Sequence, residues 1–162
     1  LKTFRRFLKI ATRFRYASDS TGETCTGDGQ VSFSPGVSRR GFDHWQLPSE
    51  TEERGAGDCE DKAIWLYAKL IEEGYTSVRL VVGKYQANQP DYHAWVVAYL
   101  GEKVYVLDPT MNYGIWEVQQ YPEGFYRPLY SYHKNNRWQH FRKPLIEEEP
   151  AEIDPLEGFF VP

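Results

Sequence analysis

The chain has 162 residues, of which 41% are hydrophobic and 16% aromatic, and a formal net charge of -4. This much apolar material excludes an intrinsically disordered chain and is enough to fold around a core without disulfide or metal staples. We expect a single domain over residues 1–162, and the two cysteines are too few for a disulfide scaffold. No stretch reaches the ~20 apolar residues of a membrane span, so we expect no transmembrane segment. Oligomeric state and compartment, periplasmic or cytoplasmic, stay open.

The two ends of the chain carry opposite charge. Residues 1–17 contain only basic charges, and their apolar residues recur at helical spacing: Leu1, Phe4, Leu8 and Ala11. Such a basic amphipathic helix could bind lipid or nucleic acid. A terminal helix docked on the core with its charges in water is the simpler interpretation, and we expect no nucleic-acid partner. Residues 18–41 predict a long irregular connection, and the acidic tail, residues 145–162, is expected to be peripheral.

The stretch GAGDCEDKAIWLYAKL, residues 55–70, begins the clearest helix in the sequence. Apolar residues recur every three or four positions between residues 59 and 73, which predicts one buried helical face. Asp58 is a good N-cap, Asp61 completes a capping box, and Gly74 favours the end of the helix.

Cys59 therefore falls at the first helical position, where free backbone N–H groups and the helix dipole favour a thiolate. The neighbouring acids Asp58, Glu60 and Asp61 oppose that charge. A compensating cation, either an imidazolium or a metal ion, is therefore expected nearby.

Three segments rich in Val, Tyr and Trp predict strands: residues 77–85, 92–100 and 103–108. Only Gly101 and Glu102 separate the last two, which suits a two-residue type II′ hairpin. In that hairpin Trp95 lies opposite Asp108, so His93, two residues along the same strand, is a diagonal neighbour of Asp108 on the same face. The pattern therefore predicts a His93–Asp108 pair. Between this hairpin and the tail we expect turns with one or two strands or a short helix.

These residues match the needs of a thiol nucleophile. A reactive cysteine requires a base that takes its proton and an acid that orients the base, and Cys59, His93 and Asp108 supply those three roles. The backbone N–H of Cys59 at the helix start is a natural donor to a developing oxyanion. The same three side chains are also possible zinc ligands, which would make a non-catalytic metal-binding or protein-binding domain.

Residues 43–109, with DHWQLPSE, GDCEDKA, HAW and VLDP in that order, resemble the bacterial transglutaminase-like cysteine proteinases of the papain-like and transglutaminase-like superfamily. The resemblance implies an α+β fold in which the nucleophile helix packs on an antiparallel β-sheet. It also implies cysteine-dependent hydrolysis of peptide or amide bonds in a protein or peptide substrate. By this resemblance Cys59 is the nucleophile, His93 the general base and then acid, and Asp108 the orienting acid. The nearest alternative is a transamidase, in which a lysine amine replaces water.

The resemblance also implies a calcium site. Some members bind calcium near the nucleophile through the acids of a D-C-E-D run, and Asp58, Glu60 and Asp61 stand at those positions. Carboxylate oxygens suit that hard cation. The same acids could instead cap the helix, pair with Lys or Arg, or be solvated, and no cofactor is required for the thiol chemistry itself.

One feature departs from the protease pattern. Papain-like proteases carry a glutamine shortly before the cysteine to complete the oxyanion hole, and residues 51–57 contain none. Trp45 and Gln46 are the candidates for this role, if they fold back towards the cysteine.

Overall fold

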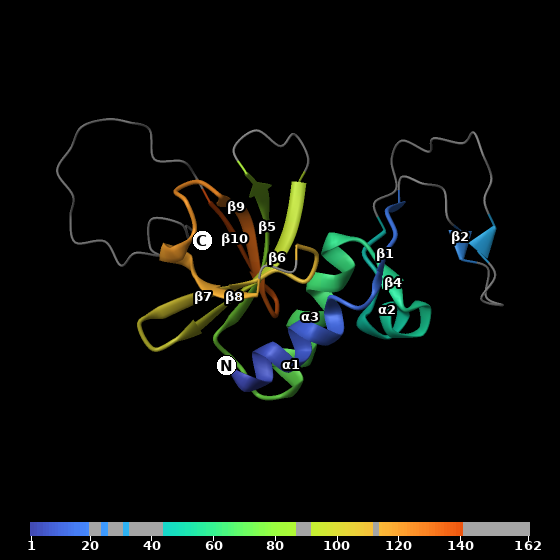
Figure 1. The fold of residues 1–162 in the computed structure, drawn as a ribbon, viewed down its shortest axis with the longest axis horizontal. Coiled ribbons are helices and arrows are strands. Elements are labelled where there is room, and N and C mark those ends of the chain that lie inside the picture. Colours follow the sequence, from blue (N-terminus) through green and yellow to red (C-terminus); the bar gives the residue numbers. More distant parts are fainter. Residues whose placement is uncertain (20–23, 26–30, 33–43, 87–91, 112–113, 141–162) are drawn as a thin grey trace.

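A six-stranded antiparallel sheet organises the structure, a computed structural model that describes residues 1–19, 24–25, 31–32, 44–86, 92–111 and 114–140. Its strands run in the order β10-β9-β5-β6-β7-β8. Their bounds are β5 (Val78–Tyr85), β6 (Tyr92–Leu100), β7 (Lys103–Leu107), β8 (Ile115–Glu117), β9 (Tyr126–His133) and β10 (Asn136–Gln139). Figure 1 shows α1 and α3 together on one side of this sheet. The predicted α+β architecture, with a helix packed on an antiparallel sheet, is confirmed.

The remaining elements are short, apart from two helices. They are α1 (Lys2–Ala11), α2 (Pro48–Arg54), α3 (Cys59–Glu72), β1 (Arg15–Tyr16), β2 (Thr24–Cys25), β3 (Val31–Ser32), β4 (Ala56–Gly57) and the 3-10 turn η2 (Val118–Gln120). β1 pairs with β4 in parallel, and β2 pairs with β3 in antiparallel fashion. None of the helices in the described part of the chain has the length and hydropathy needed to cross a membrane. Most of the predicted connection, residues 18–41, and the whole of the predicted tail lie outside the described residues.

α1 docks on α3, as the simpler interpretation of the basic segment predicted. Its buried residues are Phe4, Phe7, Leu8 and Ala11. Leu1, which was expected on this face, is 46% exposed, and Phe7 packs edge-on against Trp65 instead. Arg6 reaches across to Glu73 at 2.7 Å, but both side chains are largely exposed, so this ion pair adds little stability.

α3 buries one face against α1 and the sheet. It begins at Cys59 as predicted and ends at Glu72, one residue before the predicted end. Gly74 follows in the left-handed conformation (φ +87°), and the backbone N–H of Tyr75 donates to the carbonyl of Leu70. This is the glycine-dependent helix end that the sequence indicated. The core beneath α3 includes Ala94, Val96 and Ala98, the alternate residues of β6.

The hairpin β6–β7 has the predicted register, with Leu100 paired to Lys103 and Val96 to Leu107. Gly101 has φ +61°, and Glu102 is not among the described residues with positive φ, as a type II′ turn requires. The side chains of Trp95, Val97, Val104 and Val106 form a second apolar cluster on the face away from α3. Register and alternation thus decide which β6 residues face the helix.

The sequence analysis missed α2 and the length of β9. α2 has clear signals: Pro48 at its start, Glu50 in its first turn, and Gly55 in the left-handed conformation at its end. β9 pairs with β10, which follows it in the sequence, and with β5, which lies far from it in the sequence. A β-bulge interrupts the β5–β9 pairing between Val82 and Gly83. Long-range pairing of this kind leaves no local pattern in the chain.

Gly83 is required where β5 meets β9. A Cβ atom there would overlap the backbone carbonyl oxygen of Arg127 and come within 2.9 Å of the Cα of Pro128. We expect Gly83→Ala to lower the free energy of unfolding by about 2 kcal/mol, because backbone atoms cannot move aside cheaply. Denaturant titration measures this. Lys84→Ala is the matched control, with a loss under about 1 kcal/mol; equal midpoints for Gly83→Ala and the unmodified protein would contradict the expected clash.

His140, just after β10, is buried, and its burial together with the charge of Arg79 lowers the pKa of the imidazole to about 4. The unfolded chain therefore binds a proton at His140 between about pH 6.5 and pH 4, whereas the folded chain does not. Stability from this group falls with falling pH across that window, by at most about 1.4 kcal/mol per pH unit. We expect His140→Gln to flatten the acid side of the unfolding free energy profile. An unchanged slope would show that His140 is protonated in the folded protein.

Candidate active site

A cavity of about 340 Å³ lies where α3 begins beside the first residues of β6. Its wall includes Tyr16, Trp45, Cys59, Glu60, Tyr92 and His93. Cys59 and His93, which were predicted to belong to one site, thus line the same cavity. Among the exposed large hydrophobic residues, Tyr16, Trp45 and Tyr92 are 53%, 41% and 63% exposed. Isolated exposed aromatics are ordinary, but three around one cavity indicate a contact surface.

The thiol of Cys59 is half-buried and unoxidised. Its Sγ donates to Oε2 of Glu60 at 3.1 Å, and the backbone N–H of Ala94 donates to Sγ. Burial raises the pKa of this thiol well above its ordinary range, and the charges of Glu60 and Asp58 raise it further. The expected advantage of the helix start is therefore outweighed, as the neighbouring acids had suggested. A thiolate at Cys59 needs a positive charge beside it.

His93 and Asp108 form a buried hydrogen-bonded pair. Nε2 of His93 and Oδ2 of Asp108 are 2.6 Å apart, and the two side chains are 8% and 1% exposed. The register of the hairpin thus produces the diagonal contact that it predicted. With Nε2 bonded to the carboxylate, Nδ1 is the ring nitrogen that remains for other chemistry. Because Nε2 of His93 bonds directly to Oδ2 of Asp108, the pair does not favour the alternative in which His93 and Asp108 both bind zinc.

The carboxylate of Asp108 accepts three further hydrogen bonds. The backbone N–H groups of Thr110 and Met111 donate to Oδ1 at 2.9 and 3.1 Å. The hydroxyl of Tyr126, on β9, donates to Oδ2 at 2.8 Å. The turn after β7 therefore holds one oxygen, and a distant strand helps to hold the other.

Asp61 has a structural position rather than a place in the cavity wall. It is fully buried, and its carboxylate accepts the backbone N–H of Gln46 at 2.8 Å and that of Asp58 at 3.2 Å. The second bond is the capping interaction predicted for α3. Burial raises the pKa of Asp61 to about 6. Gly57 is needed here, because a Cβ atom at that residue would come within 2.8 Å of the carboxylate.

Of the two candidates for the oxyanion hole, the structure brings only Trp45 to the cavity. Gln46 is buried, and its Oε1 accepts a hydrogen bond from the hydroxyl of Thr51 at 3.4 Å. Its side chain is therefore engaged with α2, whereas the ring of Trp45 lies edge-on to Tyr132 and is 41% exposed.

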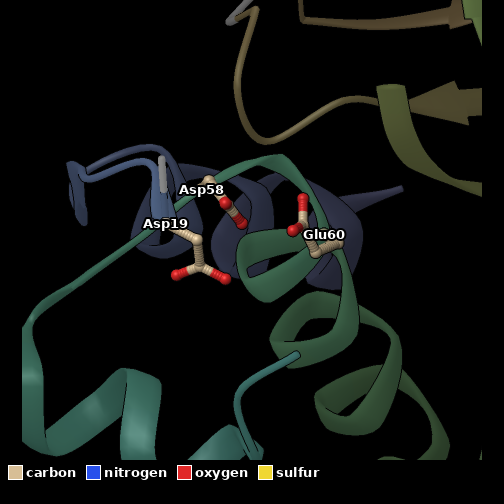
Figure 2. Close-up of side chains that lie close together, drawn as sticks. All are labelled: Asp19, Asp58 and Glu60. Atoms are coloured by element: carbon tan, nitrogen blue, oxygen red, sulfur yellow. The ribbon is translucent and has the colours of Figure 1, made fainter. Parts of the chain in front are cut away.

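Three carboxylates gather beside the start of α3, as Figure 2 shows. One oxygen each from Asp19, Asp58 and Glu60 lies within 4.8 Å of the others. The sequence analysis named Asp61 as the third acid, and the structure places Asp19 there instead. The backbone N–H of His44 donates to Asp19 at 2.5 Å, which ties the two segments together. Asp58 and Glu60 are buried, and their negative charges lie close together. Their carboxylate oxygens therefore suit the binding of a hard cation.

Sequence reasoning also missed Asp19 and Tyr126. Asp19 lies in a region without regular pattern, and only tertiary contacts bring it to α3. Tyr126 lies 18 residues beyond Asp108, in an aromatic-rich stretch with many similar tyrosines. The acids around Cys59, which oppose a thiolate, were the one signal in the sequence that another charged group lies near the start of α3.

Comparisons with known proteins agree on the fold. The structure is similar to that of Legionella pneumophila LapG in its calcium-bound form, with 21% identity and a TM-score of 0.62, over 85% of this chain and 67% of that one. The EGTA-treated form of Legionella pneumophila LapG gives 22% identity and a TM-score of 0.64, over 89% of this chain and 69% of that one. A comparison with curated protein sequences found no match.

A family model described as transglutaminase-like domain matches residues 7–136. The matched range includes α3, the hairpin β6–β7 and Tyr126, so it spans the whole candidate site. The chain therefore belongs to the transglutaminase-like domain family.

Proposed function

We propose that this protein is a cysteine peptidase or amidase that acts on polypeptides through Cys59, His93 and Asp108. The observation that carries the proposal is the shared cavity, which is lined both by Cys59 at the start of α3 and by His93, whose ring bonds to Asp108. The resemblance of the sequence to transglutaminase-like cysteine proteinases supports the same roles. The exposed aromatic side chains around the cavity support a polypeptide substrate, because they offer apolar contact area beside Cys59.

The mechanism begins with proton transfer from the thiol of Cys59 to Nδ1 of His93, while Asp108 accepts a hydrogen bond from Nε2–H and stabilises the imidazolium. The thiolate then attacks the carbonyl carbon of the substrate. The backbone N–H of Cys59 lies at the free end of α3 and donates to the oxyanion, with Trp45 as the second candidate donor. His93 returns its proton to the leaving amine as the C–N bond breaks, which leaves a thioester on Cys59.

Water completes the cycle. His93 takes a proton from the water molecule as its oxygen attacks the thioester carbonyl, and the carboxylic acid leaves as the C–S bond breaks. The proton then restores the thiol. Each step therefore needs His93 within reach of the sulfur, and Asp108 acts only through His93.

The three carboxylates beside α3 would hold a cation that assists this chemistry. Asp19, Asp58 and Glu60 offer oxygen ligands of the kind that calcium prefers. A bound calcium ion supplies positive charge close to the sulfur. Glu60, which contacts the sulfur directly, would then no longer disfavour the thiolate.

Cys59 should be the more reactive of the two cysteines. At neutral pH with calcium present, we expect iodoacetamide to alkylate Cys59 at least about tenfold faster than Cys25 in the same tube, because His93 lines the same cavity as Cys59 and can take the proton of its thiol. Peptide mass spectrometry follows both cysteines, so Cys25 is an internal reference. His93→Gln should slow the alkylation of Cys59 alone. A His93→Gln variant that reacts as fast as the unmodified protein would refute the pairing.

Calcium should both activate the thiol and stabilise the fold. Adding calcium ions should accelerate the alkylation of Cys59 and raise the melting temperature, and EGTA should reverse both effects. Asp19→Asn should raise the calcium concentration that gives half of the effect by about tenfold, because one charged ligand is lost. Glu53→Gln, which removes an exposed acid on α2, is the control and should change neither value. Equal responses from both variants would exclude Asp19 as a ligand.

A further inference from the structure

Tyr126 bonds to the same carboxylate oxygen that His93 uses, although the proposed mechanism gives it no part. Its hydroxyl donates to Oδ2 of Asp108 at 2.8 Å, and Nε2 of His93 lies 2.6 Å from that oxygen. The two backbone bonds from Thr110 and Met111 both end on Oδ1. Tyr126 therefore supplies a second hydrogen bond to Oδ2, beside that of His93.

We propose that Tyr126 is a positioning residue for the His93–Asp108 pair, an inference that rests on the proposed function. Bonds to Oδ1 alone restrain one end of the carboxylate but leave Oδ2 free to swing about it. A second donor on Oδ2 fixes the lone pair that remains for His93, because hydrogen bonds at a carboxylate oxygen have preferred directions. Tyr126 thus sets the orientation of the imidazole through Asp108.

The ring of Tyr126 is itself held rigidly. Ring centroids of Trp95, Tyr121 and Phe125 lie 5.0, 4.9 and 5.3 Å from its own. Trp95 also stacks on His93, at 6.1 Å with an interplanar angle of 26°. The aromatic cluster therefore contacts both partners of the pair, and Tyr126 is the member that adds a hydrogen bond.

The hydroxyl of Tyr126 remains a donor throughout the working range of the site. Burial raises the pKa of Tyr126 far above its ordinary value, and the nearby charge of Asp108 raises it further. The raised pKa favours the protonated hydroxyl, which donates to Asp108. A protonated hydroxyl at this place can orient the acid.

A variant that lacks only this hydroxyl distinguishes the effect of the hydrogen bond from the effect of ring packing. Tyr126→Phe keeps the ring, and Tyr130→Phe, on the same strand, is the matched control because no described hydrogen bond links Tyr130 to Asp108. The first measurement is the downfield proton resonance of Nε2–H of His93, assigned by its loss in Asp108→Ala. We expect Tyr126→Phe to shift or broaden this resonance and Tyr130→Phe to leave it unchanged. In the unmodified protein, a nuclear Overhauser contact should link this proton to the hydroxyl proton of Tyr126.

The second measurement is the rate of Cys59 alkylation by iodoacetamide at neutral pH with calcium. Tyr126→Phe should slow it about tenfold, and it should add nothing in an Asp108→Ala background. Absence of the Overhauser contact, or an unchanged resonance in Tyr126→Phe, would overturn the role of Tyr126. If Cys59 of the unmodified protein reacts no faster than Cys25, the proposed function fails instead, and the resonance still decides the role of Tyr126.

Discussion

The hydrogen bond between His93 and Asp108 is the interaction on which the site depends. It exists because a two-residue turn at Gly101 sets the register of β6 and β7, and alternation then puts both side chains within diagonal reach. A shift of the register by one residue would turn His93 to the other face of the sheet and separate the pair. The chemistry proposed for Cys59 therefore rests on the backbone geometry of one hairpin.

The start of α3 has to satisfy several demands at once. Its first residue is the candidate nucleophile, its capping depends on Asp61, and Glu60 contributes to an acidic cluster. Like charges and burial raise the cost of a thiolate at Cys59, so the same residues that build the helix start oppose its chemistry. Positive charge from His93, and from a cation at the cluster, is the physical means of resolving this conflict.

Local signals were enough to predict part of this arrangement. The span of α3, the hairpin register and the docking of α1 follow from periodicity, capping residues and a short turn, all of which act over a few positions. They were sufficient for the His93–Asp108 contact, whereas the α+β fold was implied by the resemblance to transglutaminase-like cysteine proteinases. Leu1 shows the limit of periodicity, since a terminal residue on the apolar face can stay exposed while Phe7 packs in its place.

Other features depend on contacts that no local pattern encodes. Asp19 reaches α3 only through the tertiary fold, β9 pairs with a strand far away in the sequence, and Tyr126 finds Asp108 through that pairing. The side chain of Gln46 accepts a hydrogen bond from Thr51, and its backbone N–H donates to Asp61. Both bonds join buried groups, and no local pattern in the sequence indicates them. Reading α2 correctly would have been possible, since its proline, glutamate and glycine signals were present.

The central claim is that His93 stabilises a thiolate at Cys59, and ultraviolet absorbance of the thiolate tests it most directly. The signal is the difference between the protein and its Cys59→Ala variant, followed against pH with calcium present. We expect a thiolate at neutral pH that disappears in His93→Gln. A thiolate that forms only in alkaline solution, with the same midpoint whether or not His93 is present, would contradict the claim.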